Sequence, residues 1–150
     1  MSEVTSASGD TGAAPRAAEG GCLCGAVRYR LTGEPVASFI CHCRTCRAAS
    51  SAPSVAWLTV GVDGFANLKG TPRRYVSSPG VTRAFCEACG SPLVYANADD
   101  PSTLDVTTVS MDDPTLFAPT RELWLSHKIG WEAVNGTLDH HLQDSSSRPL

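Results

Sequence analysis

The chain has 150 residues, of which 42% are hydrophobic, and this size and composition suit one domain with one ordinary core. The formal net charge of −3 argues against nucleic acids and anionic membranes as partners, because a weakly acidic protein has no general attraction to them. No run reaches the roughly 18 apolar residues of a membrane span, and the N-terminus lacks the features of a signal peptide. We therefore expect a cytoplasmic protein.

The two ends of the chain differ in composition from its middle. Residues 1–18 are rich in Ser, Ala and Gly and have almost no large apolar side chains, so they predict a disordered N-terminal tail. Residues 136–150 predict a similarly polar C-terminal tail, in which His140 and His141 are expected to be solvated. The folded domain is therefore expected at residues 19–135.

Short β-type runs, separated by Gly, Pro and Asp, fill this middle part. The first is AVRYRL at 26–31, where apolar residues alternate with arginines as in a half-buried strand. Further strands are predicted at 36–40, 54–60, 82–86, 92–96, 103–109 and 122–126. The stretch NLKGTPRRY at 67–75 is expected to be a turn with a solvated face. The only helical candidate is the short run at 44–50, so the fold class is all-β.

Seven cysteines are the most informative feature of the sequence. They are grouped, not scattered, as Cys22 with Cys24, then Cys41, Cys43 and Cys46, then Cys86 with Cys89. An odd count without an export signal argues against a disulfide framework. Short cysteine spacings beside turn residues are typical of metal sites, so we predict metal binding.

Geometry suggests how the sulfurs divide. A tetrahedral zinc holds its sulfurs about 3.8 Å apart, whereas residues i and i+2 of a flat strand lie about 7 Å apart, so each Cys pair needs a curled backbone. Glycines beside both outer pairs supply that freedom. The two pairs would together form a closed, structural four-sulfur site, whereas the middle three cysteines would leave a vacant position, as catalytic zinc sites do.

Two alternatives remain open from spacing alone. In one, the first pair shares an ion with Cys41 and Cys43, and Cys46 joins the last pair. In the other, His42 supplies the fourth ligand of the middle site. Because His42 stands between two ligands, a supporting or exposed role is the favoured interpretation.

Five segments in this order and spacing carry a family resemblance. They are GGCLCGAVRY, CHCRTCR, FCEACGSPLVY, SMDDP and HKIGW, and they span roughly residues 19–133. The sequence resembles the glutathione-dependent formaldehyde-activating enzyme family, also called the CENP-V/GFA domain. The resemblance implies a β-tent fold of antiparallel sheets held together by zinc. It implies one structural zinc on Cys22, Cys24, Cys86 and Cys89 and a second on Cys41, Cys43 and Cys46.

The resemblance also implies a reaction. Glutathione would condense with formaldehyde to S-hydroxymethylglutathione, or the adduct would be cleaved, which is formally the reaction of a carbon–sulfur lyase. Two positions depart from the family pattern. Ser50-Ser51 stands where many relatives have Ser-Gly, and Glu122-Leu123-Trp124 stands where relatives often have His-Ile-Trp. Both departures are expected to alter the pocket.

Several side chains are candidates for binding the substrate. Arg44 and Arg47 flank the open site and are expected to meet the carboxylates of a glutathione-like thiol, with Arg73, Arg74 and Arg83 behind them. The candidate proton donors are His42, Glu87 and His127. Among the tryptophans, Trp131 is expected to lie near the site because it matches a family motif, and core packing is expected for the other two.

Two functions of different classes follow. The first is a zinc-dependent enzyme that joins a small thiol and an aldehyde at a zinc ion on Cys41, Cys43 and Cys46, with two zinc ions in the chain. The alternative is a non-enzymatic zinc-binding scaffold with the same fold, which a large exposed apolar patch would favour. A vacant position on an ion favours the enzyme, because a scaffold has no use for it.

Overall fold

The computed structural model describes residues 17–147 and 149, so most of the predicted N-terminal tail lies outside the described residues. The described part is mostly β-structure, as predicted. The strands are β1 (Ala18–Gly21), β2 (Arg28–Leu31), β3 (Ala37–Cys41), β4 (Val55–Gly61), β5 (Phe65–Lys69), β6 (Arg73–Ser78), β7 (Val81–Phe85), β8 (Pro92–Asn97), β9 (Thr103–Thr107), β10 (Arg121–Leu123) and β11 (Asp139–His140). One α-helix, α1 (Arg44–Ser50), and the 3-10 turns η1 (Val62–Gly64), η2 (Thr108–Ser110), η3 (Pro114–Phe117) and η4 (Leu125–His127) complete the described elements.

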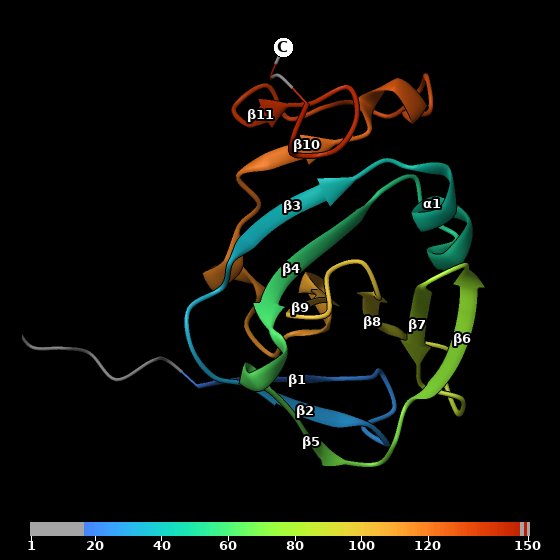
Figure 1. The fold of residues 1–150 in the computed structure, drawn as a ribbon, viewed down its shortest axis with the longest axis vertical. Coiled ribbons are helices and arrows are strands. Elements are labelled where there is room, and N and C mark those ends of the chain that lie inside the picture. The colour runs from blue at the N-terminus through green and yellow to red at the C-terminus, as the bar shows by residue number, and fades with distance from the viewer. Residues whose placement is uncertain (1–16, 148, 150) are drawn as a thin grey trace, which may run out of the picture.

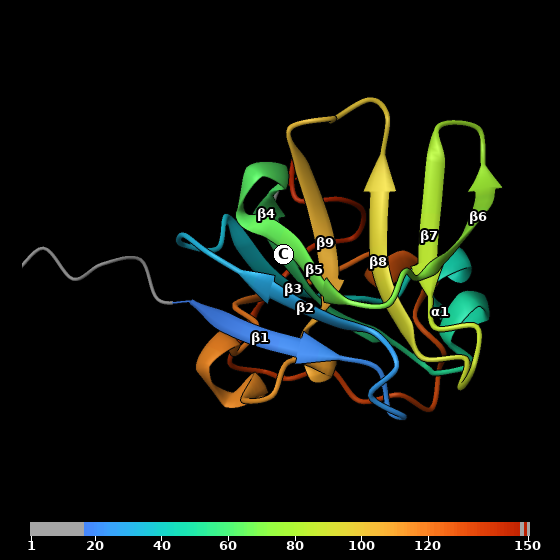
Figure 2. The same cartoon turned by 90° about the horizontal axis from the view of Figure 1, so that it is seen from below.

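The strands form two sheets that cross at a steep angle (Figures 1 and 2). The small sheet has the order β1-β2-β5, and the large sheet has the order β11-β10-β3-β4-β9-β8-β7-β6. Most neighbours are antiparallel, as expected, but β10 runs parallel to both β3 and β11. The large sheet is therefore mixed at the end that carries the C-terminal segment.

Each face of the large sheet carries its own hydrophobic cluster. Leu58 belongs to the main core, which lies between the two sheets and includes Tyr29 from the small sheet. Its neighbour Trp57 belongs to a second cluster, which includes Cys41 and Cys46. Because successive side chains of a strand point to opposite faces, these clusters lie on opposite sides of β4. The two groups of cysteines are divided between them.

The predicted strands are present, with ends shifted by up to three residues, but β1, β5, β6 and β11 were not predicted. The stretch 67–75, expected to be a turn, contains the end of β5 and the start of β6, so that prediction is correct only for its middle. Its side chains are exposed except that of Pro72, as the expected solvated face requires. The polar residues of β5 and β6 hid the strands, because alternation is weak where both faces meet solvent.

Helix α1 has the predicted bounds, Arg44–Ser50. Its N-cap is Cys43, whose Sγ accepts a hydrogen bond from the Cys46 backbone N–H at 3.3 Å. Its C-cap is Ser51, which adopts the left-handed conformation with φ 52° and ψ 36°. Within the described part of the chain, no helix has the length and apolar character that crossing a bilayer requires.

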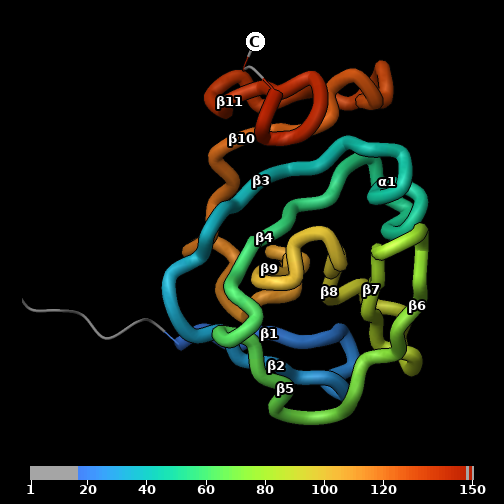
Figure 3. The backbone as a smooth tube through the Cα atoms, in the orientation of Figure 1, coloured from blue at the N-terminus to red at the C-terminus, as the bar shows by residue number. Residues whose placement is uncertain are grey.

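The segment after residue 135 packs against the large sheet and is not a loose tail. Figure 3 shows the chain after β10 folding back beside that strand, and β11 pairs with β10. His141 is buried, and its Nδ1 lies 2.8 Å from the Ser147 carbonyl oxygen. The prediction of a solvated His141 is therefore wrong. Backbone pairing with a sheet edge ordered a segment whose polar composition alone does not predict a fold.

Candidate metal centres

The first cluster joins two turns that are far apart in sequence. Cys22 and Cys24 lie between β1 and β2, and Cys86 and Cys89 lie between β7 and β8. All four sulfurs lie within 4.8 Å of one another. The Sγ atom of Cys24 is 3.6 Å from that of Cys22 and 3.8 Å from that of Cys86, close to the sulfur spacing of a tetrahedral zinc–thiolate site.

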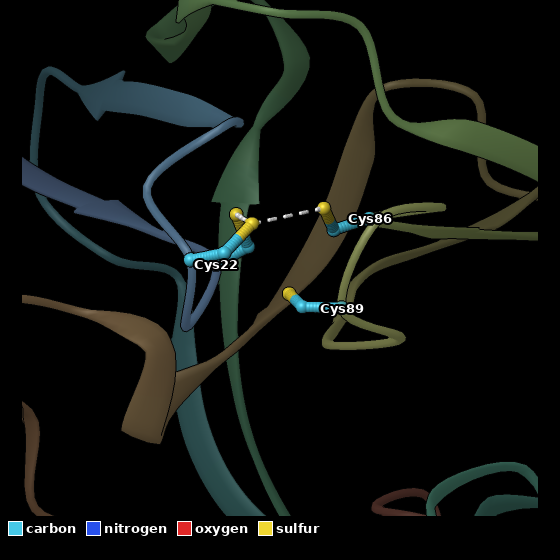
Figure 4. Close-up of side chains that lie close together, drawn as sticks. Cys22, Cys86 and Cys89 are labelled. Atoms are coloured by element: carbon cyan, nitrogen blue, oxygen red, sulfur yellow. Dashed lines mark hydrogen bonds between the residues drawn. The ribbon is translucent and has the colours of Figure 1, made fainter.

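Figure 4 shows Cys22, Cys86 and Cys89 pointing toward one another from these two turns. Hydrogen bonds support two of the sulfurs from outside the cluster. The Val27 backbone N–H donates to Cys22 Sγ at 3.2 Å, and the Ser91 hydroxyl lies 3.2 Å from Cys89 Sγ. Such contacts are typical of groups that hold metal-binding thiolates in place.

The second cluster comes from six residues at the start of α1. The sulfurs of Cys41, Cys43 and Cys46 lie within 4.8 Å of one another, and two of these residues are buried. In the described part of the chain, no fourth ligand-type side chain joins this group. The mixed partition of the cysteines is thus excluded by distance, because the outer pairs lie together and away from the middle three.

All seven thiols are free, and each cluster contains at least one thiol whose pKa is lowered. Hydrogen bonds from Cys41, then from Cys46, hold the pKa of Cys43 well below its ordinary value. The side chain and then the backbone of Ser91 lower the pKa of Cys89 to about 5. A thiolate is the form that binds a metal, so both clusters have a donor set suited to a metal ion, and both could hold one.

His42 does not join the cysteine trio and is paired with a buried carboxylate. Its Nε2 lies 3.0 Å from Glu122 Oε2, and only 1% of the His42 side chain and 3% of the Glu122 side chain are exposed. The other oxygen of Glu122 accepts a hydrogen bond from the Asn135 N–H at 2.8 Å. His42 is thus a supporting residue that ties the cysteine loop to β10 and the C-terminal segment. Glu122 belongs to one of the two segments that depart from the family pattern. The sequence alone does not predict its pairing with His42.

A cavity of about 470 Å³ opens beside the second cluster, and it is called the cysteine cavity below. All three cysteines line it, together with four aromatic side chains: Phe39, Trp57, Tyr95 and Trp124. The remaining lining residues are Arg44, Thr45, Arg83, Leu123 and His127. The four-sulfur cluster contributes no residue to this cavity. The geometry therefore separates a four-sulfur cluster from a three-sulfur cluster that faces open space.

Arg83 is the cation most closely associated with the cysteine trio. Its Nη2 donates to Cys46 Sγ at 3.6 Å, and its guanidinium lies 5.0 Å from the centre of the Tyr95 ring. Its Nε donates to the Ser77 hydroxyl at 3.2 Å. Sequence order placed Arg83 behind the site, because it is 37 residues from Cys46. The register of β7 against β8, which pairs Arg83 with Tyr95, brings it to the cluster.

The other predicted site residues divide into two groups. Arg44 and His127 line the cysteine cavity, whereas Arg47 is not among its lining residues. Glu87 is exposed and paired with Arg73, away from the cavity.

The expectation for the tryptophans is wrong in part. Trp131 is 74% exposed and does not line the cysteine cavity. Trp57 packs in the core as expected, but it also lines the cavity. Trp124 lines the cavity as well and stacks on the ring of His127 at 5.2 Å. A match to a family motif marked Trp131, but the folded chain places Trp57, on β4, and Trp124, directly after β10, at the cavity.

Comparison with known proteins agrees with this arrangement. A family model described as glutathione-dependent formaldehyde-activating enzyme matches residues 17–127, which include all seven cysteines. The chain belongs to this family. An uncharacterised lyase of Schizosaccharomyces pombe is 33% identical over 78 residues, which cover 52% of this chain and 56% of the relative. The chain thus aligns with little more than half the length of that relative.

A solved structure supports the fold. A crystal structure of a Rhodobacter sphaeroides protein superposes with a TM-score of 0.54 and 20% sequence identity, and the match covers 63% of this chain and 87% of that one. At this identity the likeness concerns the fold alone. It places the two crossed sheets in a known architecture.

Proposed function

We propose that the protein is a zinc-dependent carbon–sulfur lyase that joins a small, glutathione-like thiol to an aldehyde of the formaldehyde type. The observation that carries this proposal is the three-sulfur cluster, which faces a cavity of about 470 Å³. Membership of the family and the name of the yeast relative support a lyase. We propose that Cys22, Cys24, Cys86 and Cys89 hold a structural zinc and that the trio holds a second one.

In the reaction, the thiol sulfur forms a bond to the aldehyde carbon while the carbon–oxygen π bond opens. The thiol loses its proton and the new hydroxyl oxygen gains one, so atoms and charge balance, and the lyase direction is the reverse. Zinc on three thiolates would supply a vacant position for a soft ligand and lower the pKa of a substrate thiol there. The aromatic walls would exclude water from the reacting groups.

We assign the remaining roles to residues that line the cavity. His127 is the one predicted proton donor that reaches it, and its Nδ1 is buried without a hydrogen-bond partner in the structure. This ring would carry the proton to the new hydroxyl. Arg83 would hold Cys46 in place through its hydrogen bond to Sγ. Arg44, which is exposed at the cavity, would bind a carboxylate of the thiol.

The test combines metal analysis with thiol binding. Zinc-replete protein should contain two zinc ions per chain, and the cobalt-substituted protein should change its absorption spectrum when glutathione binds. Arg44→Gln should weaken glutathione about tenfold and leave mercaptoethanol unchanged, because one charge-assisted contact is lost. Arg47→Gln is the matched control, since Arg47 does not line the cavity. A protein that binds two metals but no thiol would contradict the proposal.

A further inference from the structure

A second cavity, of about 550 Å³, lies between α1 and the strands β6, β7 and β8. We call it the α1 groove. Its walls are largely apolar, and they include Ala49, Val55, Phe85, Pro92 and Val94. The proposed reaction of formaldehyde does not need this space. All three cysteines line the cysteine cavity, so an aldehyde as small as formaldehyde can meet the sulfur cluster there.

The α1 groove adjoins the cysteine cavity. Thr45, Cys46, Trp57 and Arg83 line both cavities. The two cavities are therefore neighbours that share one wall, and Cys46 belongs to that wall. The groove thus lies directly beside the proposed active site.

Four polar side chains of the groove, those of Thr45, Ser50, Ser77 and Arg83, already have partners within the protein. The Ser50 hydroxyl donates to the Cys46 carbonyl oxygen at 2.8 Å, and Arg83 is bonded to both Ser77 and Cys46. Thr45 Oγ1 lies 3.3 Å from Cys43 Sγ. The groove therefore offers an apolar surface and no uncommitted charge, which favours a hydrocarbon group over a carboxylate.

We infer that the α1 groove binds an apolar substituent on the aldehyde carbon, so that the substrate class is aliphatic or aromatic aldehydes larger than formaldehyde. This inference rests on the proposed function. The same bonds form and break as with formaldehyde, and one hydrogen on the carbonyl carbon is replaced by a hydrocarbon chain. Formaldehyde has no such chain and would leave the groove without a ligand.

The charges decide which of the two reactants extends into the groove. Arg44 lines the cysteine cavity but not the groove. A thiol with carboxylates is therefore held on the Arg44 side, and the groove is left for the aldehyde. Since the two cavities meet at Cys46, both reactants can approach the same sulfur cluster from different sides.

A first experiment measures the groove without any reaction. Zinc-replete protein labelled with ¹⁵N is titrated with unreactive primary alcohols, from propan-1-ol to hexan-1-ol, and amide shifts are followed by NMR. Each added methylene should tighten binding by about fourfold, with the largest shifts in α1 and β7. Equal affinity along the series, or shifts centred elsewhere in the molecule, would overturn the inference.

Neighbouring residues of β6 provide matched variants. Tyr75 lines the groove and is 63% exposed, whereas Val76 is 66% exposed and does not line it. Tyr75→Ala should weaken hexan-1-ol at least about threefold and Val76→Ala should leave it unchanged. Ala49→Trp, an exposed helix position that lines the groove, should weaken it more than tenfold by filling the space. Identical binding by all three variants would contradict the assignment.

A second experiment separates this inference from the proposed function. The enzyme-dependent rate of adduct formation with glutathione is compared for formaldehyde and hexanal. A preference for hexanal that Tyr75→Ala reduces, and Val76→Ala does not, is the expected result. Equal acceleration for both aldehydes would overturn the inference and keep the lyase. Acceleration of neither aldehyde would overturn the lyase, and chain-length-dependent alcohol binding would then define an apolar ligand site only.

Discussion

The two cysteine clusters lie on opposite faces of one sheet and are built in different ways. The four-sulfur cluster joins turns more than 60 residues apart, at the edge of the main core. The three-sulfur cluster comes from a single stretch at the start of α1 and faces a cavity with aromatic walls. The first arrangement suits a link between distant segments, and the second suits a site that a small molecule can reach.

The backbone near the two clusters differs in the same sense. Gly25 and Gly90, beside the four-sulfur cluster, adopt positive φ angles of 72° and 77°, which cost glycine nothing. Near the three-sulfur cluster, positive φ angles occur at Ser51 and Trp124, whose side chains disfavour them. Among the described residues, both non-glycine positive φ angles therefore lie in segments that flank the three-sulfur cluster or its cavity. Such strain is common at functional sites, where the surrounding structure must hold it in place.

The largest effect should come from breaking the four-sulfur cluster. Cys86→Ser removes a buried ligand that joins the β7–β8 turn to the β1–β2 turn. Because the free energy of binding a structural zinc contributes directly to folding, the variant should lose its cooperative thermal transition or melt at least about 20 °C lower. Metal content and circular dichroism are measured on the same sample. Unchanged melting would show that this cluster is not structural.

The complementary change is made in the three-sulfur cluster. Cys43→Ala should retain the fold and one metal ion, but lose the second ion and about three orders of magnitude of activity, roughly 4 kcal/mol of transition-state stabilisation. A substitution of the exposed Cys24 cannot serve as the control for Cys43→Ala, because Cys24 belongs to the four-sulfur cluster. If Cys43→Ala unfolds the protein as severely as Cys86→Ser does, both clusters are structural and the scaffold function gains support.

Sequence reasoning was most successful where the residues in contact are only a few positions apart in the chain. The bounds of α1 and the grouping of Cys41, Cys43 and Cys46 follow from short-range patterns, whereas the pairing of the two outer cysteine pairs was only one of the divisions that spacing allowed. Sequence reasoning was least successful where the register between strands determines which residues come into contact. Arg83, Tyr95 and Asp105 come together in one cross-strand row of β7, β8 and β9, and no spacing along the chain encodes this row. The burial of His141 likewise depends on pairing at a sheet edge.

Loss of the buried carboxylate beside the three-sulfur cluster should have the next largest effect. Glu122→Ala leaves His42 and the Asn135 N–H without their partner and should cost about 3 kcal/mol of unfolding free energy. It should also weaken metal binding at the three-sulfur cluster by about 10-fold to 100-fold and leave the other cluster unaffected. Glu122→Gln is the control. It keeps the side-chain shape and one of the two acceptor oxygens, so it should lose less stability and less metal affinity than Glu122→Ala. Equal loss of metal from both clusters would show a general, not a local, role.

A smaller effect should come from relieving strain at the end of α1. Ser51→Gly places a residue without a Cβ at the left-handed C-cap and should raise the free energy of unfolding by about 1 kcal/mol. Ser50→Gly is the control, because Ser50 is helical and its hydroxyl bonds to the Cys46 carbonyl, so this change should destabilise by a similar amount. Urea denaturation of both variants measures the difference. Destabilisation by Ser51→Gly would show that the serine side chain contributes more than the strain costs.

The smallest effect should depend on pH and concerns Asp105, on the same face of the sheet as Tyr95. Burial raises the pKa of Asp105 above its ordinary value of 3.8, despite a 2.6 Å hydrogen bond from the Thr59 hydroxyl. A raised carboxyl pKa means that the contribution of Asp105 to stability is full below 3.8 and is lost as pH rises through the folded-state value. Asp105→Asn keeps an acceptor for Thr59 and cannot ionise. The stability of the variant relative to the wild type should therefore increase from pH 4 to pH 7, as measured by urea denaturation at several pH values. A pH-independent difference would show that Asp105 has the same pKa in the folded and unfolded chain.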